Sequence, residues 1–365
     1  MEKMVKPKVL FSNCYANKRV LVTGHTGFKG SWLVLWLQQL GAQVTGYSLG
    51  IESPSHFEQL STNCKTIAGD IGNRSQLEQA FMEFQPDIVF HLAAQSLVRD
   101  SYREPLSTYE TNVLGTLHVL LAAQKCKSVK AFVNVTTDKV YENKEDGKPY
   151  QENDGLGGHD MYSSSKACAD ILAASFRKSF LNKDGFLLAT VRAGNVIGGG
   201  DWANERLIPD LIRAAIKSEA AEIRSPKSIR PWEHVLEPLS GYLLLGQKLL
   251  EGNKEYAASW NFGPAAHQHK TVLDIVNLMQ SHWNRIQFEI NEEEAKKFHE
   301  AGTLNLDCQK AAKKLNWQPV WGIEKTIHYT TNWYKDFIEK NILNSEADIN
   351  TYVKDAINAS VVWTL

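Results

Sequence analysis

The sequence predicts an α/β protein built on a doubly wound, Rossmann-like parallel sheet, with a smaller, mostly C-terminal domain for the substrate. Short apolar runs alternate with helical patterns from Lys18 to about Arg192, which is typical of parallel strands covered by helices on both faces. A glycine loop stands between the first apolar run and the first helical pattern. After Gly194 the segments become short, mixed and rich in Pro, Trp and Arg, and this change predicts the second domain.

Each apolar run predicts one strand, and the runs lie at 20–22, 43–47, 66–68, 88–92, 131–135 and 187–191. Ligands of such sheets bind beyond the carboxyl ends of the strands. Glycine or polar residues follow the first, fourth, fifth and sixth runs. We therefore expect the functional site at this edge of the sheet.

The domain boundaries follow from the same change of pattern. We predict a dinucleotide-binding domain over 14–197, a discontinuous substrate domain over 198–340 and a helical tail over 341–365. Residues 234–264 contain a long apolar helical pattern and a short apolar run, so we expect them to return to the first domain.

Composition excludes several classes of protein. Lys and Arg number 40 against 41 Asp and Glu, and no basic block is present, so we expect no nucleic-acid partner. No apolar run reaches membrane-spanning length, and 1–13 does not resemble a signal peptide. The five cysteines are scattered, which predicts a reducing, cytoplasmic location and no structural zinc. We interpret His267 and His269 as part of a polar loop, and we expect no bound metal.

The glycine loop predicts a dinucleotide site. Its spacing is G-x-x-G-x-x-G between a strand and a helix, where backbone can approach a pyrophosphate at a helix N-terminus. The candidate residues are Gly24, Thr26, Gly27, Phe28, Lys29 and Gly30. About twenty residues further on, Tyr47 to Leu49 offer no carboxylate for a ribose diol. Since Lys29 could suit a 2′-phosphate, these residues leave NAD and NADP both open.

Tyr162 and Lys166 are the candidate proton-transfer pair. They are four residues apart in a helical stretch and therefore share a face. An ammonium beside a phenol favours phenolate, which can take the proton of a carbinol as hydride leaves. Thr137 is a second hydrogen-bonding candidate for the same group. The alternative is a surface Tyr and Lys that share a helix face by accident.

A family resemblance rests on several of these motifs together. Thr23 to Gly30, Asp70-Ile71, His91 to Gln95, Thr111-Asn112, Tyr162 with Lys166, and Arg192 to Val196 resemble the extended short-chain dehydrogenase/reductase family over nearly the whole chain. Longer stretches are similar to the nucleotide-sugar 4,6-dehydratases of that family, in the branch that acts on CDP-sugars. These stretches are Gly24 to Trp32, Thr137 to Lys139, Gly198 to Trp202 and Arg230 to Val235.

The resemblance implies a lyase that uses bound NAD. It implies oxidation at C4 of a nucleotide-linked glucose with Thr137, Tyr162 and Lys166, loss of water from C5 and C6 with Asp138 as acid, and return of the hydride to C6. In the wider group a glutamate follows the aspartate and serves as the C5 base. This chain has Lys139 there, which leaves the C5 base open.

The resemblance also implies binding residues and an assembly. Further cofactor contacts fall on Asp70, Ile71, Leu92, Ala93, Ala94, Gln95 and Thr111, together with Tyr162 and Lys166. Nucleotide-sugar contacts fall on Ser96, Asn195, Arg206, Leu207, Ile208, Pro209 and Arg230. A homodimer or homotetramer is implied, paired through apolar helices at 108–123 and 167–180.

Several of these positions could instead have a purely structural role. Asp70 could be a turn aspartate, Arg206 a surface ion pair, and Trp32 with Trp36 simple packing. Two other functions also remain open. A nucleotide-sugar 4-epimerase would need Tyr162 and Lys166 but no acid at Asp138, and a dinucleotide-sensing protein would need no proton-transfer set.

Overall fold

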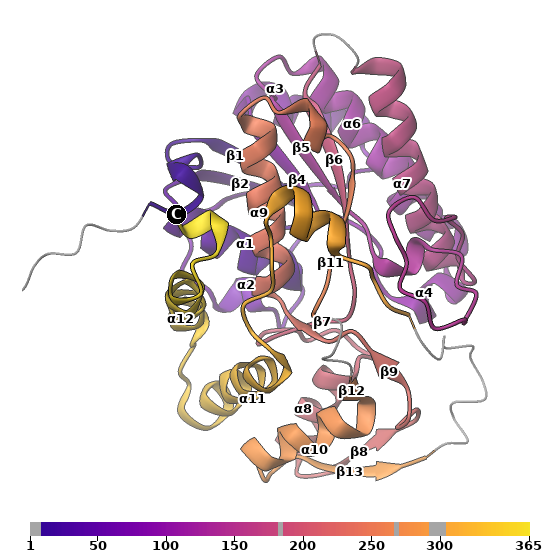
Figure 1. Cartoon of the computed structure of the whole chain (residues 1–365), viewed down its shortest axis with the longest axis vertical. Helices are drawn as coiled ribbons and strands as arrows, with labels where there is room; N and C mark the ends of the chain where they lie inside the picture. The colour runs from indigo at the N-terminus through magenta and orange to yellow at the C-terminus, as the bar shows by residue number, and fades with distance from the viewer. Residues whose placement is uncertain (1–8, 182–184, 266–269, 292–303) are drawn as a thin grey trace, which may run out of the picture.

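The computed structural model describes residues 9–181, 185–265, 270–291 and 304–365 (Figure 1). Its centre is a seven-stranded parallel sheet in the order β11-β6-β5-β4-β1-β2-β3. The strands are β1 (Arg19–Thr23), β2 (Gln43–Ser48), β3 (Lys65–Ala68), β4 (Ile88–His91), β5 (Ala131–Val135), β6 (Leu187–Ala193) and β11 (Ser259–Phe262). The chain order reverses between β1 and β4, the point at which such sheets bind ligands. The predicted doubly wound sheet is confirmed.

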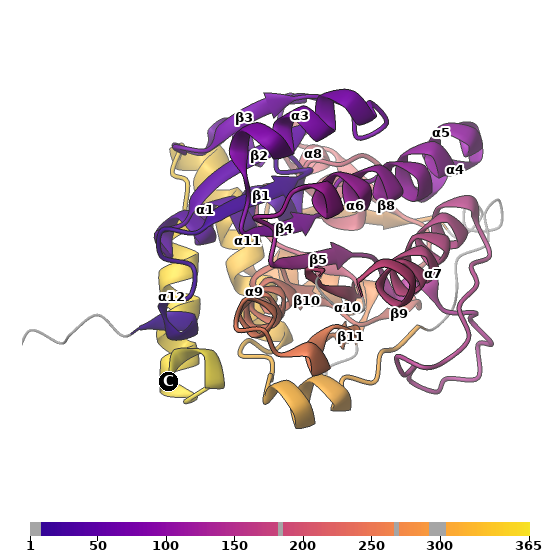
Figure 2. The same cartoon turned by 90° about the horizontal axis from the view of Figure 1, so that it is seen from above.

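Helices cover both faces of the sheet, as Figure 2 shows. One face carries α1 (Phe28–Gln39) and α9 (Leu236–Leu250), and the other carries α3 (Arg74–Phe84), α6 (Thr116–Lys125) and α7 (Met161–Phe180). Side chains of each strand alternate between the two apolar cores. In β1, for example, Val20 and Val22 join the core under α1, while Leu21 joins the core under α6.

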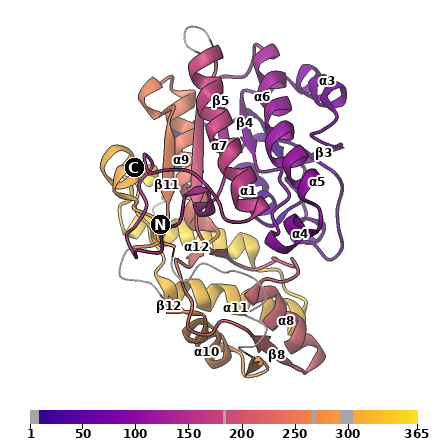
Figure 3. The same ribbon diagram turned by 90° about the vertical axis from the view of Figure 1, so that its right-hand side faces the viewer.

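A smaller group of elements lies beyond the carboxyl edge of the sheet (Figures 1 and 3). It consists of α8 (Leu207–Lys217), β8 (Ala220–Ile223), β9 (Ile229–Arg230), β12 (Lys270–Thr271), α10 (Val272–His282), β13 (Gln287–Ile290) and α11 (Ile323–Lys340). It is joined to the sheet through β7 (Val196–Ile197), which follows β6 and pairs in parallel with β10 (Glu233–His234). The expected polar loop at His267 to His269 lies outside the described residues.

The expected helix at 108–123 is not continuous. The chain forms α5 (Pro105–Tyr109), a π-helical segment η2 (Glu110–Gly115) and then α6. The wider turn carries Asn112, whose amide accepts a hydrogen bond from the Gln95 backbone N–H and donates to the hydroxyl of Ser165. Such π-bulges frequently occur at functional sites, and here the bulge connects the β4 loop to α7.

The C-terminal residues complete the core rather than trail from it. Helix α12 (Ser345–Asn358) packs against α1, and Trp363 stacks on Phe11 with ring centroids 5.0 Å apart. Trp32 and Trp36 are fully buried in the same core, which confirms their interpretation as packing residues. All five cysteines are unpaired thiols. Within the described ranges, no helix is long and apolar enough to span a bilayer.

Candidate active site

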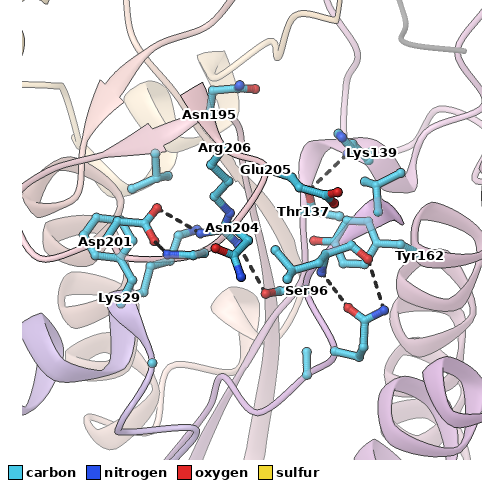
Figure 4. Close-up of a pocket in the computed structure, with 18 of the residues that line it drawn as sticks. Lys29, Ser96, Thr137, Lys139, Tyr162, Asn195, Asp201, Asn204, Glu205 and Arg206 are labelled. Carbon is cyan, nitrogen blue, oxygen red and sulfur yellow. Dashed lines mark hydrogen bonds and ion pairs between the residues drawn. The ribbon is translucent and has the colours of Figure 1, made fainter. Parts of the chain in front are cut away.

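One cavity of about 2180 Å³ lies at the carboxyl edge of the sheet and extends toward α8. Every residue that the sequence predicted for catalysis, cofactor binding or substrate binding lines this cavity. Figure 4 shows Thr137, Lys139 and Tyr162 on one side of it and Asp201 with Arg206 on the other. Residues far apart in the sequence therefore form one site.

The glycine loop is pressed against the end of β4. Gly24 has φ +71°, and a Cβ atom there would lie 2.7 Å from the backbone nitrogen of Ala93. A Cβ atom on Gly30 would lie 2.2 Å from the carbonyl oxygen of Gly24. No side chain fits at either position. Gly27, the N-cap of α1, supplies no side-chain cap, so the N-terminus of α1 can accept an anionic ligand.

The end of β2 offers hydroxyl groups instead of a carboxylate. Thr26 donates a hydrogen bond to Ser48 (3.2 Å), and the Tyr47 hydroxyl donates to the Asp70 carbonyl oxygen (3.0 Å). The Asp70 carboxylate accepts from the Gly72 N–H at 2.7 Å, so it also forms the local turn that was its alternative interpretation. This part of the cavity is polar and suits the ribose and adenine end of a dinucleotide.

Lys29 lies away from that end. Burial lowers the pKa of Lys29 to about 8, while the charges of Glu233 and Asp138 act to raise it. The ammonium is therefore in the electrostatic neighbourhood of the predicted acid, at the reaction end of the cavity. This position does not suit a 2′-phosphate contact, which the sequence had left open.

His91 at the end of β4 is a fixed structural group. Its ring nitrogens are hydrogen-bonded to Thr23 at 2.6 Å and to Thr116 at 3.0 Å. Burial, with a smaller effect of Lys166, lowers the pKa of His91 to about 3. The imidazole is therefore neutral and locks β1, β4 and α6 together beneath the site.

The predicted proton-transfer residues meet where β5 ends and α7 begins. Thr137 is the N-cap of a 3-10 helix, η3 (Asp138–Val140), and its hydroxyl donates to Asp138 Oδ1 at 2.9 Å. Asp160 caps α7 by accepting from the N–H and the hydroxyl of Ser163. This cap fixes the first turn, which carries Tyr162.

Burial of the Tyr162 phenol acts against the phenolate that the sequence spacing predicts. Lys166 Nζ donates to the carbonyl oxygen of Val135 at 2.9 Å, and burial lowers the pKa of Lys166 to about 8. Burial raises the pKa of Tyr162 to about 12, and the Thr137 hydrogen bond opposes that rise. Desolvation of the phenol thus outweighs the attraction that sequence spacing suggested.

The Asp138 carboxyl has the environment of an acid. It is only 3% exposed, and burial raises its pKa, while Lys139 and the hydrogen bond from Thr137 oppose the rise. Lys139 itself is exposed at the cavity. The burial that a neutral amine base would require is therefore absent at Lys139.

The far wall carries an organised arginine. Arg206 is the N-cap residue of α8, and its Nη1 lies 3.0 Å from Asp201 Oδ2 while Nη2 donates to Ser96 at 3.2 Å. Arg206 therefore forms an ion pair, as its alternative interpretation predicted. The pair is not a surface one, because Asp201 is buried and both residues line the cavity. Beside it, Glu205 Oε1 lies 3.2 Å from Arg99 and from Arg103 of α4 (Val98–Arg103).

Sequence reasoning missed Glu233. It is 1% exposed, and among the described residues neither carboxylate oxygen has a hydrogen-bond partner in good geometry. Burial raises its pKa well above the usual range, and Lys29 acts in the opposite direction. The sequence signal was a carboxylate between Trp232 and His234, a polar residue in an apolar stretch. Asp201 and Glu205 were missed as well, since only the fold brings them to Arg206 and α4.

Two kinds of comparison with known proteins agree with this geometry. The family profile described as GDP-mannose 4,6 dehydratase matches residues 21–330. CDP-glucose 4,6-dehydratase of Salmonella typhimurium is 46% identical over 351 residues, covering 93% of this chain and 98% of the relative.

Solved structures share the fold. Epimerase Mth375 of Methanothermobacter thermautotrophicus superposes with a TM-score of 0.79 at 23% identity, covering 90% of this chain and 95% of that one. dTDP-glucose 4,6-dehydratase of Bacillus anthracis, solved in complex with NAD, gives a TM-score of 0.73 at 23% identity, covering 88% and 98%. At this level of identity, both likenesses are evidence for the fold alone. Within the described residues, no group of three or more His, Cys, Asp or Glu side chains could hold a metal ion.

Proposed function

This chain belongs to the GDP-mannose 4,6 dehydratase family, and on that basis we propose that it is a lyase that converts CDP-D-glucose to CDP-4-keto-6-deoxy-D-glucose with bound NAD. The substrate assignment is supported by the relative of 46% identity, a CDP-glucose 4,6-dehydratase. The proposed reaction is oxidation at C4, elimination of water from C5 and C6, and return of the hydride to C6.

One observation carries the proposal. The buried carboxyl of Asp138 is hydrogen-bonded to Thr137, whose hydroxyl is also a neighbour of the Tyr162 phenol. An acid therefore stands directly beside a set of residues suited to carbinol oxidation. An enzyme that only inverts C4 has no leaving group to protonate and no use for this acid.

The glycine loop and its neighbours fit a dinucleotide cofactor. Gly24 and Gly30 leave no room for a Cβ atom, and the N-terminus of α1 lacks a side-chain cap, so a pyrophosphate can approach backbone N–H groups there. When bound, NAD supplies a hydride acceptor at C4 and a hydride donor at C6. The residues proposed to hold it are Gly24, Thr26, Gly27, Phe28, Lys29, Gly30, Asp70, Ile71, Leu92, Ala93, Ala94, Gln95, Thr111, Tyr162 and Lys166.

Tyr162 is proposed as the base at C4. Its phenol lies in the cavity beside Thr137, and both groups can hydrogen-bond to a 4-hydroxyl. Lys166 is anchored to the end of β5 through Val135, from where its ammonium can orient the cofactor and the phenol. We expect the cofactor's own charge to make the phenol a stronger acid than burial alone allows.

Asp138 is proposed as the acid at C6, and Lys139 as a charged group at C5. Burial raises the pKa of this carboxyl, which favours the protonated form that can donate to a leaving group. Lys139 is exposed at the cavity next to Asp138, and we propose that its side chain stabilises the enolate that forms when C5 loses its proton. This assignment accounts for a lysine where the wider group has a glutamate.

Arg206 and Arg230 are proposed to bind the diphosphate. Asp201 holds Arg206 in place before substrate arrives, and a planar guanidinium suits phosphate oxygens. Arg230 lines the same cavity. Ser96, Asn195, Leu207, Ile208 and Pro209 line the same cavity, and we assign the remainder of the nucleotide-sugar to them.

The test is a labelled conversion. Purified protein is incubated with CDP-glucose carrying deuterium at C4, in parallel with dTDP-glucose and UDP-glucose. We expect CDP-4-keto-6-deoxyglucose with the deuterium at C6, no net NADH and a clear preference in kcat/KM for the CDP-sugar. A C4 epimer would identify the epimerase alternative, the absence of any product would favour the sensing protein, and equal or reversed rates would assign another nucleotide.

We further propose a homodimer or homotetramer and a cytoplasmic location. The assembly is supported by exposed apolar side chains on neighbouring helices, namely Leu106, Leu114, Ile171 and Phe180. The location is supported by five scattered, unpaired thiols. Light scattering of the purified protein tests the assembly, which a monomer of 41.0 kDa would contradict.

A further inference from the structure

The proposed reaction leaves one proton to be moved inside the protein in every cycle. Oxidation of C4 transfers the O4 proton to Tyr162, and departure of the 6-hydroxyl takes one proton from Asp138. The hydride lost at C4 returns at C6, and the C5 proton leaves and returns. The cycle therefore ends with one proton too many on Tyr162 and one too few on Asp138.

Thr137 lies between these two groups. Its hydroxyl donates to Asp138 Oδ1 at 2.9 Å, and it lies close enough to the Tyr162 phenol to act on the pKa of that phenol. Figure 4 shows Thr137 next to Tyr162. A hydroxyl donates one proton and accepts two hydrogen bonds. The single proton of Thr137 points to Asp138, and one lone pair accepts from the Lys139 N–H at 3.4 Å. The other lone pair is left to accept from the phenol once Tyr162 is protonated, so a transfer through Thr137 runs from Tyr162 toward Asp138.

We propose that Thr137 relays the proton of the substrate 4-hydroxyl from Tyr162 to Asp138, so that the water that leaves C6 carries it away. The inference rests on the proposed function and adds the path by which acid and base are reset. In the relay the Tyr162 O–H bond breaks and a new O–H bond forms on Thr137. The original Thr137 O–H bond breaks as its proton passes to Asp138 Oδ1. Phenolate and carboxylic acid are restored together, with no oxidant, reductant or solvent proton.

Burial makes a solvent route to Asp138 poor. Thr137 is 8% and Asp138 3% exposed, and Asp138 Oδ2 lies on the side of Gly194, 3.4 Å from where a Cβ atom of that glycine would stand. Bound substrate and cofactor would exclude more water from the same cavity. A fixed hydroxyl is then the available carrier for the proton.

The end points of the relay favour this direction. The pKa of Tyr162 is raised to about 12 by burial, but a phenol remains a much stronger acid than water, so the hydroxide that leaves C6 is a stronger base than the Tyr162 phenolate. Transfer from the phenol to the departing hydroxyl is therefore downhill overall. Asp138 carries the proton between Thr137 and the departing hydroxyl. Its pKa therefore affects the rate of water loss but not the free-energy difference between the phenol and the departing hydroxyl.

The test uses a leaving group that needs no proton. We compare the wild-type enzyme with Thr137→Val and Thr137→Ser on CDP-glucose and on CDP-6-deoxy-6-fluoro-glucose, and follow bound NADH by stopped-flow absorbance. Formation of NADH reports C4 oxidation, and its decay reports elimination and hydride return. The control is Thr136→Val, which removes a hydroxyl one residue earlier that donates to Asp170.

With CDP-glucose, Thr137→Val should slow the decay of NADH at least ~10-fold, and small buffer acids should restore part of it. With the fluoro sugar its decay should match that of the wild-type enzyme. Thr137→Ser keeps the hydroxyl and should recover most of the NADH decay that Thr137→Val loses, whereas Thr136→Val should decay normally with both sugars. A defect in Thr137→Val that is confined to NADH formation, or that is equal for the two sugars, would overturn the relay.

A second measurement uses only the wild-type enzyme, so that the relay can be tested even if a variant does not fold. In mixtures of light and heavy water, two protons moving together make the rate of NADH decay a curved function of deuterium content. The fluoro sugar should give a straight line. Straight lines for both sugars would overturn the relay. Absence of both NADH and keto sugar with CDP-glucose would instead contradict the proposed function itself.

Discussion

At the scale of single residues, the first prediction concerns Tyr162. Its buried phenol has a pKa raised to about 12, so deprotonation should limit C4 oxidation over the neutral range. We predict that Tyr162→Phe lowers turnover by ~10²- to 10⁴-fold, because a general base is lost. Binding of CDP-glucose, measured by calorimetry, should be retained since the ring remains. The wild-type rate of oxidation should rise with pH, and the variant should lose this dependence.

Lys139 gives the second prediction at this scale. Lys139→Met should still form bound NADH and 4-keto sugar, but it should exchange the C5 hydrogen with deuterated water more slowly, because the enolate loses its ammonium. Nuclear magnetic resonance of the recovered sugar measures the exchange. The matched control is Lys148→Met, an exposed lysine paired with Asp146, which should exchange normally. Normal C5 exchange in Lys139→Met would exclude Lys139 from this step.

Many residues that the sequence placed in the site stand in a strand-end motif or a glycine loop, where local spacing already determines position, as with Gly24 and Thr137. Others, such as Tyr162 in α7 and Arg206 at the start of α8, were placed there by the helix spacing or by the family resemblance. The sequence did not reveal Glu233 because its position depends on tertiary structure. When β10 pairs with β7, its carboxylate is buried with no hydrogen-bond partner among the described residues. The Tyr162 phenolate was expected from helix spacing alone, and spacing does not report how deeply a phenol is desolvated.

At the scale of elements, buried strands were predictable and helix detail was not. Strands such as β4 and β5 are buried at every position because helices cover both faces, so they are mostly apolar and the sequence alone reveals them. The break in the helix at 108–123 depends on Asn112 reaching Gln95 and Ser165. No periodic pattern encodes such contacts. The beginning of α7 at Met161 depends likewise on the Asp160 cap.

The buried Asp348 of helix α12 leads to a prediction about how the stability of the protein depends on pH. Asp348 in the first turn of this helix is 5% exposed, one of its oxygens lacks a partner within the described residues, and burial raises its pKa to about 8. A raised pKa means that stability is fully present below the unfolded value near 4 and is lost as pH rises toward 8. We predict that Asp348→Asn raises the free energy of unfolding by ~2 to 4 kcal/mol near pH 8 and changes it little near pH 4.

Chemical denaturation at both pH values measures this effect, and Asp355 on the same helix is the matched control. Burial acts to raise the pKa of Asp355, but hydrogen bonds from Lys325 and Trp321 outweigh it, so the pKa is lowered. Its contribution is present above the unfolded value and lost as pH falls. Asp355→Asn should therefore destabilise the protein near neutral pH. The same sign for both variants would contradict the electrostatic explanation.

At the scale of the whole molecule, a hydrogen-bond network connects the C-terminal residues to the first turn of α1. Ser345 is its central residue, since its hydroxyl is hydrogen-bonded to His56 Nε2 at 2.7 Å and accepts from Trp333 Nε1 at 2.9 Å. His56 Nδ1 in turn is hydrogen-bonded to Ser31 in the first turn of α1, at 2.7 Å. The sequence predicted a helical tail here. Its integration could not be predicted, because no local pattern connects residues 289 positions apart.

The hydrogen-bond network around Ser345 leads to the last prediction. Ser345→Ala leaves the buried groups of His56 and Trp333 without their partner, which costs about 1 to 3 kcal/mol and should lower the melting temperature accordingly. Because His56 also holds Ser31, the first turn of α1 should loosen, and NAD should raise the melting temperature less than it does in the wild-type protein. Differential scanning with and without NAD measures both. Ser360→Ala, an exposed position near the same terminus, should change neither. A variant with a lower melting temperature but an unchanged response to NAD would show that Ser345 supports the core without reaching the cofactor loop.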